Sequence, residues 1–192
     1  MQVTIAAQAC LLVLGLDHEY YRRVRTILVY PTRYKDRNRS MSHWGTVTEG
    51  DVVCLGETRD RGPVVLAWDT VWRRSQNRKS VGNVVYHEFA HQLDLLDDLV
   101  DGTPPLATAT ARNQWVKVMT AEFAQLRDSV AGGLVTLLDD YGATNVGEFF
   151  AVATECFSQK SAQLQQRHLR LYEVLRDVYR QYPASRLDKP DR

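Results

Sequence analysis

The chain has 192 residues, which is enough for one domain with a hydrophobic core. Apolar residues make up 44% and charged residues 24% of the sequence, proportions that are typical of an ordinary globular protein. Lys and Arg number 24 against 23 Asp and Glu, so the formal net charge of +1 argues against nucleic acid or an anionic membrane as the main partner.

The cysteines and the N-terminus bear on where the protein works. Cys10, Cys54 and Cys156 are far apart and form no C-x-x-C pair, a usage typical of small buried residues in a reducing compartment. The first sixteen residues are apolar but lack a cationic start, and the run is too short to span a bilayer. We therefore expect a soluble, cytoplasmic protein with a buried N-terminal helix.

The first part of the chain is predicted to mix helix and strand. In chain order, the expected elements are a largely buried helix over 3–15, a short helical turn over 17–23, and strands over 26–30, 52–55 and 63–68. Residues 32–50 are polar and loop-like, and the turn-rich segment 57–62 separates the last two strands.

The remainder of the chain is predicted to be helical. In order, we expect a helix that starts near Asp69 as its N-cap, helices over 82–96, 107–131, 145–158 and 161–181, a loop over 97–106, and a polar tail over 183–192. This outline is an α+β arrangement in a single domain, with a mixed sheet lobe over about 1–80 and a helical lobe over about 81–182.

A possible metal site lies in the segment V-V-Y-H-E-F-A-H-Q-L-D, residues 84–94. On a helix, residues four positions apart share one face, so His87 and His91 can direct two imidazoles at one ion. Glu88 is offset by about 100° around the axis, where it can reach a water held by the metal. This H-E-x-x-H arrangement is typical of zinc peptidases, although such a short motif also arises by chance on an ordinary helix face.

A catalytic zinc site needs a third protein ligand. Asp97 lies six residues after His91, where metzincin-like proteases place theirs, but that pattern needs a glycine at position 94. Glu148 begins an apolar helical segment, in which an unpartnered carboxylate would be costly. Glu155, two turns later on the same face, is a third candidate.

Two segments together resemble a known family. H-E-F-A-H-Q-L-D over 87–94 and Y-G-A-T-N-V-G-E-F-F-A-V over 141–152 resemble the Mlc titration factor A family of bacterial zinc peptidases. The same segments are similar to the catalytic domain of anthrax lethal factor. The resemblance to the first family also includes residues 6–12 and 62–69, so it extends over most of the chain.

The resemblance implies a zincin-like metallopeptidase fold and a set of site residues. It makes His87, His91 and Glu148 the ligands of Zn²⁺, and Glu88 the general base. It also implies that the hydroxyl of Tyr141 stabilises the oxyanion, whereas the structural alternative is a loop tyrosine that covers the core.

Two further features have alternative interpretations. Asp94 matches the family's motif and would either orient a ligand histidine or form a charge on the helix surface. The strand over 63–68 is the candidate edge strand that pairs with an extended peptide substrate, and a purely structural role in the sheet is the alternative.

The resemblance implies a cytoplasmic zinc peptidase, an aminopeptidase that acts on short peptides. It also implies binding to the glucose repressor Mlc, which relieves repression of sugar-uptake genes. The alternative is a regulatory repressor-binding protein with a secondary or vestigial metal site. Because family members carry more sequence before the segment 6–12, we expect a missing N-terminal portion or a shorter variant.

Overall fold

A computed structural model describes most of the chain. The described residues are 1–16, 18–32, 34–36, 52–54, 56–58, 62–76, 82–97, 99 and 101–186. Most of the predicted loop over 32–50, the predicted strand end at Leu55, and the tail beyond residue 186 lie outside these ranges.

The N-terminal part contains one α-helix, one 3₁₀ turn and five short strands among the described residues. These are α1 (Gln2–Leu12), η1 (His18–Tyr21), β1 (Ile27–Tyr30), β2 (Tyr34–Asp36), β3 (Val52–Cys54), β4 (Gly56–Thr58) and β5 (Val64–Ala67). The predicted helix, helical turn and three strands are therefore confirmed. Two predictions were wrong, because β2 begins inside the expected loop and β4 occupies the start of the expected turn.

The strand order corrects the prediction of an edge strand over 63–68. β5 lies in the middle of a three-stranded sheet of order β1-β5-β4, parallel to β1 and antiparallel to β4. All four of its residues are buried, as expected for a strand with a neighbour on both sides. An extended substrate therefore cannot pair with β5, since both of its edges are taken. β2 and β3 form a separate antiparallel pair.

The described residues of the remaining chain are mainly helical. The elements are α2 (Trp68–Gln76), α3 (Val84–Asp94), η2 (Leu95–Asp97), α4 (Ala109–Ala131), η3 (Asp140–Ala143), α5 (Val146–Gln159), α6 (Ser161–Arg167), α7 (Leu169–Tyr179) and η4 (Pro183–Arg186). The predicted helix over 161–181 is two helices, because His168 leaves the helical region with φ −136° and ψ 56°. α2 begins at Trp68, so Asp69 lies in its first turn and is not its N-cap.

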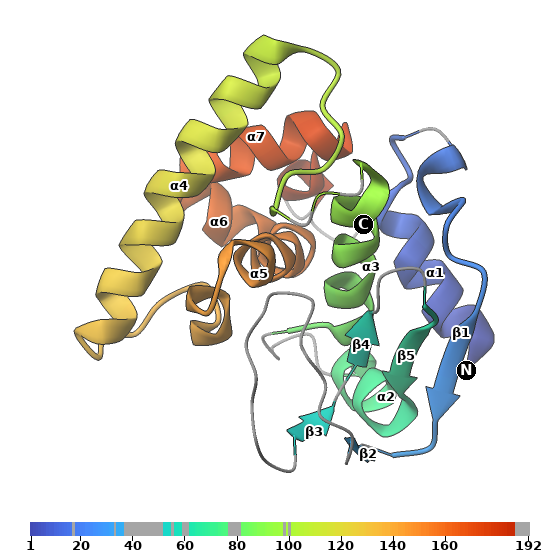
Figure 1. Cartoon of the computed structure of the whole chain (residues 1–192). Coiled ribbons are helices and arrows are strands. Elements are labelled where there is room, and N and C mark those ends of the chain that lie inside the picture. Colours follow the sequence, from blue (N-terminus) through green and yellow to red (C-terminus); the bar gives the residue numbers. More distant parts are fainter. Residues whose placement is uncertain are drawn as a thin grey trace, which may run out of the picture.

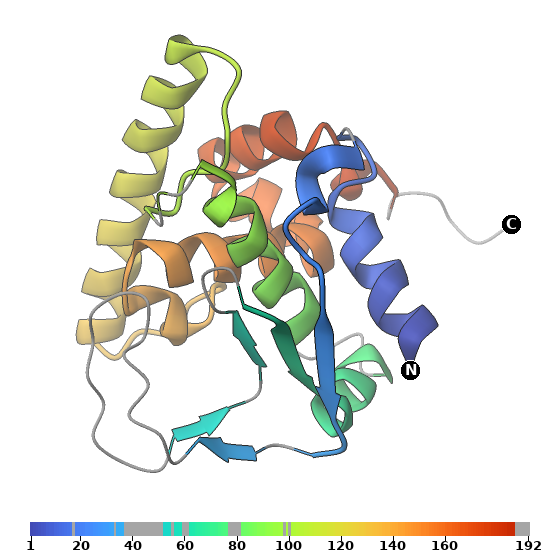
Figure 2. The same cartoon turned by 45° about the vertical axis from the view of Figure 1, so that its right-hand side comes forward.

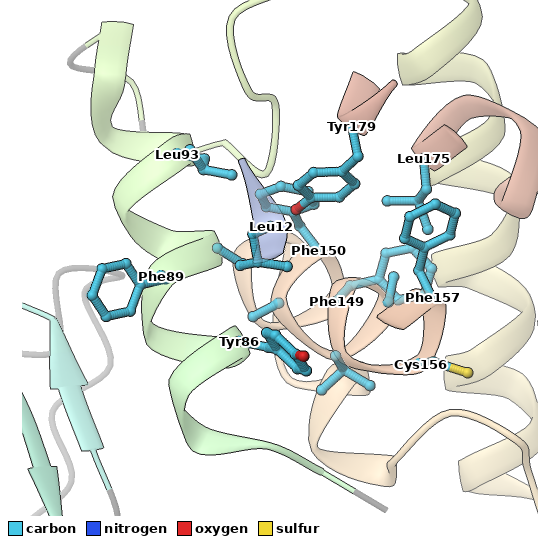
Figure 3. Packing of buried hydrophobic residues seen from close by; sticks show 14 of the residues in the cluster. Leu12, Tyr86, Phe89, Leu93, Phe149, Phe150, Cys156, Phe157, Leu175 and Tyr179 are labelled. Carbon is cyan, nitrogen blue, oxygen red and sulfur yellow. The ribbon is translucent and has the colours of Figure 1, made fainter. Parts of the chain in front are cut away.

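Helix α3 lies between the two parts of the molecule, with the sheet and α1 on one side and α4 to α7 on the other (Figures 1 and 2). The core is continuous across it: Leu93 of α3, Phe150 and Phe157 of α5 and Tyr179 of α7 belong to one buried cluster, in which the rings of Phe157 and Tyr179 stack (Figure 3). This arrangement confirms the α+β class. Because α3 and α5 are buried on nearly every face, each polar side chain on them needs a partner.

Helix α1 is much less buried than predicted. Only Ile5, Ala9 and Leu12 are buried, all on one face, and Val3 is 82% exposed. The hydroxyl of Tyr21 donates to the carbonyl of Ala9 and so fastens the turn η1 to this helix. Among the described residues, none of the helices has the length and apolarity required to cross a bilayer.

Candidate metal centre

The start of α3 is fixed by a side-chain cap, and this fixes the direction of its histidines. The Oδ1 atom of Asn83 accepts hydrogen bonds from the backbone N–H groups of Val85 at 3.0 Å and Tyr86 at 3.3 Å. Such a cap satisfies donors that the first helical turn would otherwise leave without partners. His87 and His91 follow one and two turns later and point the same way, with ring centroids 4.9 Å apart.

The start of α5 is fixed in the same manner. Oδ1 of Asn145 accepts from the N–H groups of Gly147 and Glu148, each at 3.0 Å. Glu148 therefore lies in the first turn of α5, beside α3. A carboxylate at this position also gains from the positive end of the helix dipole.

The structure brings together His87, His91 and Glu148, the residues predicted as metal ligands. Nε2 of His87 lies 2.9 Å from Oε2 of Glu148, and Nε2 of His91 lies 3.5 Å from the same oxygen. The two Nε2 atoms are 3.3 Å apart. Ligands about 2.0–2.1 Å from a shared zinc ion with tetrahedral angles are about 3.3 Å from one another, so the donor set fits such an ion.

The side chains of the cluster shift each other's pKa values in opposite directions. Burial raises the pKa of Glu148, but hydrogen bonds from His87 and His91 outweigh it and hold that pKa well below the usual range. Burial lowers the pKa of His87, yet the carboxylates of Glu148 and Glu155 outweigh it and leave that pKa well above its usual value. A proton on Nε2 of His87 therefore takes the place that a metal ion would require, and the two compete.

Glu155 lies on the opposite side of the His87 ring from the cluster. Its Oε1 atom is 2.7 Å from Nδ1 of His87, and Oε2 accepts a hydrogen bond from the backbone N–H of Asn83. Glu155 was predicted as an alternative metal ligand. Its carboxylate instead contacts Nδ1 of His87, the ring nitrogen that faces away from the cluster. The signal for this contact was its position two helical turns after Glu148, on the same face of α5.

Asp97 lies outside the cluster. It is exposed at the end of η2, and its Oδ1 accepts from the N–H of Leu99 at 3.1 Å. Among the described residues, His87, His91 and Glu148 form the group whose ligand atoms all lie within 4.8 Å of one another. The structure therefore favours Glu148 over Asp97 as the third member of the site.

The two predicted catalytic residues border the cluster. Glu88 is buried, 5% exposed, and its negative charge is close enough to His87 to act on that histidine's pKa. Tyr141, in the turn η3, has its ring centroid 5.9 Å from that of His87. Tyr141 is 55% exposed, so it lies at the side of the cluster that faces solvent.

Asp94 has a role that neither predicted alternative described. It is fully buried, so the prediction of a surface charge is wrong, and its carboxylate accepts from the N–H groups of Gly102 at 3.1 Å and Thr103 at 2.9 Å. Burial raises its pKa to about 7. Gly102 has φ +73°, and a Cβ there would lie 2.6 Å from the carbonyl oxygen of Val146, so this loop can lie against the start of α5 only with glycine.

Comparisons with known proteins agree with this geometry. The family model described as glucose-regulated metallo-peptidase M90 matches residues 1–180. The chain is 42% identical over 180 residues to an uncharacterized protein of Synechocystis sp., which covers 93% of the chain and 66% of that protein. It is 31% identical over 192 residues to Mlc titration factor A of Serratia proteamaculans, covering 98% of the chain and 72% of that protein. For Mlc titration factor A of Yersinia pestis the identity is 28%, with 98% and 70% covered.

Proposed function

The chain belongs to the glucose-regulated metallo-peptidase M90 family, and from this premise we propose that it is a zinc-dependent peptidase with a zincin-like fold. The observation that carries the proposal is the convergence of His87, His91 and Glu148, from two separate helices, to within ligand distance of one point. Two imidazoles and one carboxylate are the donor set of many catalytic zinc sites, which keep a fourth position for water or substrate.

Each residue of the proposed site has a defined task. His87, His91 and Glu148 would hold the zinc ion, which when bound would supply Lewis acidity and lower the pKa of water toward 7. Glu88 follows His87 on α3 and takes the proton of the attacking water, which it then delivers to the leaving amine. The hydroxyl of Tyr141 donates a hydrogen bond to the carbonyl oxygen as negative charge develops there.

The proposed substrate is a peptide, and the proposed activity is that of an aminopeptidase in the cytoplasm. Metallopeptidase family membership supports peptide hydrolysis. The restriction to free amino termini comes from the resemblance to the Mlc titration factor A family. Comparing hydrolysis of short peptides with free and with acetylated amino termini tests it, because an aminopeptidase leaves the acetylated set intact.

A regulatory role is the second candidate, and the relatives' name favours it. The similar proteins of Serratia proteamaculans and Yersinia pestis, at 31% and 28% identity, are called Mlc titration factor A. We propose that this chain also binds an Mlc-type repressor. In the alternative function, repressor binding is the main activity and the metal site is secondary or vestigial. Repressor binding that survives loss of hydrolysis would support the alternative.

The substitution Glu88→Gln tests the proposed peptidase directly. Gln has the same shape but cannot accept the proton, so turnover should fall by about 10²- to 10⁴-fold while zinc content stays at the wild-type level. Glu173→Gln on α7 is the matched control and should change neither quantity. Peptide turnover that persists in a verified Glu88→Gln preparation contradicts the mechanism.

A further inference from the structure

We propose that Glu155 is a positioning residue of the metal centre, because its carboxylate holds the His87 ring by Nδ1 and directs Nε2 toward His91 and Glu148. The inference rests on the proposed function, in which Nε2 of His87 is a ligand. It adds a residue that determines how well the site binds its ion without contacting that ion.

The contact between Glu155 and His87 places a proton on Nδ1, the ring nitrogen that faces away from the cluster. Oε1 of Glu155 lies 2.7 Å from Nδ1 of His87, and both side chains are largely shielded from solvent, at 9% and 14% exposure. An ionised carboxylate can only accept hydrogen bonds, so Nδ1 keeps its proton when a metal ion replaces the proton on Nε2. Nε2 then presents its lone pair when the metal binds, and a carboxylate behind a ligand histidine also makes that histidine a stronger donor.

One helix holds both nitrogens of His87. Glu148 and Glu155 are seven residues apart on α5, two helical turns, and so share a face. The His87 ring lies between them, with Nε2 2.9 Å from Glu148 and Nδ1 2.7 Å from Glu155. Because of this spacing on α5, Glu148 lies at the proposed ion site and Glu155 lies at the opposite edge of the His87 ring.

The beginning of α3 fixes Glu155 in turn. Its Oε2 atom accepts from the backbone N–H of Asn83, the residue that caps α3. Gly82, one residue earlier, has φ +95°, and a Cβ there would lie 2.1 Å from Nη1 of Arg74 and 3.3 Å from Oε2 of Glu155. Glycine thus lets the Arg74 guanidinium and the Glu155 carboxylate both approach the same stretch of backbone. Glu155 is consequently held by one end of α3 while it orients a side chain one turn further along.

A second histidine–glutamate pair of the same chemistry provides a matched control. Nδ1 of His168 lies 2.7 Å from Oε2 of Glu122, with exposures of 17% and 14%. This pair joins α4 to the residue before α7, and neither residue belongs to the cluster of His87, His91 and Glu148. Any general effect of breaking a half-buried histidine–glutamate contact should appear equally in both pairs.

The test compares Glu155→Gln with Glu122→Gln in the whole chain. Asn83 and His87 meet different oxygens of Glu155, so in Gln, where NH₂ replaces one oxygen, a donor group must face one of these two donors. Zn²⁺ affinity is measured by competition with a chromophoric chelator, and thermal unfolding of the metal-free proteins reports on the fold. We expect Glu155→Gln to bind Zn²⁺ about 10- to 100-fold more weakly than wild type, and Glu122→Gln to bind as wild type does.

The possible results separate the inference from the proposed function. Wild-type Zn²⁺ affinity in Glu155→Gln overturns the inference and leaves the peptidase proposal intact, as does an equal loss in both variants. A wild-type protein that binds no Zn²⁺ overturns the proposed function itself. If Glu155→Gln does not fold, the zinc-loaded wild type decides: a downfield, exchange-protected Nδ1 proton of His87 in the NMR spectrum supports the inference, and its absence overturns it.

Discussion

Helix α3 carries two groups of polar side chains, Asp94 at its C-terminal end and His87 with His91 in its middle. The two groups have different kinds of partner. At its C-terminal end, each oxygen of the Asp94 carboxylate has a backbone N–H of its own, from Gly102 or Thr103. In its middle, the side chains of His87 and His91 converge on each other and on Glu148, with two Nε2 atoms 3.3 Å apart. What distinguishes the two groups is convergence of lone-pair donors from several side chains, which is the property of a binding site, whereas Asp94 stabilises a loop.

The largest effect is expected from removing the carboxylate of the middle group. Glu148→Ala deletes one of three proposed ligands, so the loss of Zn²⁺ affinity should exceed the about 10- to 100-fold typical of residues behind the ligands. Metal content after dialysis against defined Zn²⁺ measures it. Asp97→Ala is the control, and a loss of zinc in that variant with retention in Glu148→Ala would reverse the assignment.

The second largest effect is expected at Tyr141, which lies at the exposed side of the cluster of His87, His91 and Glu148. Tyr141→Phe removes only a hydroxyl, so we expect kcat for peptide hydrolysis to fall by about 10²-fold, as for the loss of one oxyanion donor. Zn²⁺ affinity should not change, because the ring and its packing against His87 remain. Wild-type kcat in this variant would leave Tyr141 with a structural role only.

Substitution of Asp94, at the C-terminal end of α3, should lower the stability of the protein and leave Zn²⁺ binding unchanged. Asp94→Ala leaves the N–H groups of Gly102 and Thr103 without their acceptor, at a cost of about 1–3 kcal/mol each in unfolding free energy. Urea denaturation of the metal-free protein measures this cost. A large loss of Zn²⁺ affinity in a folded Asp94→Ala protein would contradict the contrast between the two groups and favour the histidine-orienting role.

The smallest effect is a pH dependence that belongs to Asp94. Its pKa is raised from 3.8 to about 7 in the folded chain, so between these values the folded state binds a proton that the unfolded state has released. Stability from this residue is complete below about pH 4 and declines as the pH rises toward 7. The difference in unfolding free energy between wild type and Asp94→Asn, measured without metal, should follow this decline. If the difference in unfolding free energy stays constant with pH, the pKa of Asp94 is not raised in the folded chain.

Local periodicity was sufficient to predict the site's outline. The four-residue spacing of His87 and His91 fixes their common face whenever the segment is helical. Glu148 could be expected to lie near them because an apolar helix does not bury a carboxylate without a partner. The contacts of Asp94 with the loop over 102–103 were not predictable, since they depend on how that loop packs between α3 and the start of α5.

The sequence carried a signal for the central position of β5, but none for the break at His168 or for the exposed faces of α1. Val64–Ala67 is apolar at every position, a pattern that favours a central strand over an edge strand, and this signal was available in the sequence. The break at His168 had no glycine or proline to mark it, and the contact of that side chain with Glu122 comes from a distant helix. For α1, apolar residues all around the helix gave no indication of which face the rest of the chain covers.

The central claim is that side chains from α3 and α5 bind one divalent ion together. The X-ray absorption spectrum of the zinc-loaded protein tests it most directly. We predict two imidazole nitrogens and at least one carboxylate oxygen at about 2.0–2.2 Å from zinc, with one imidazole lost in His87→Ala. A zinc environment of sulfur ligands, or one unchanged by His87→Ala, would contradict the account.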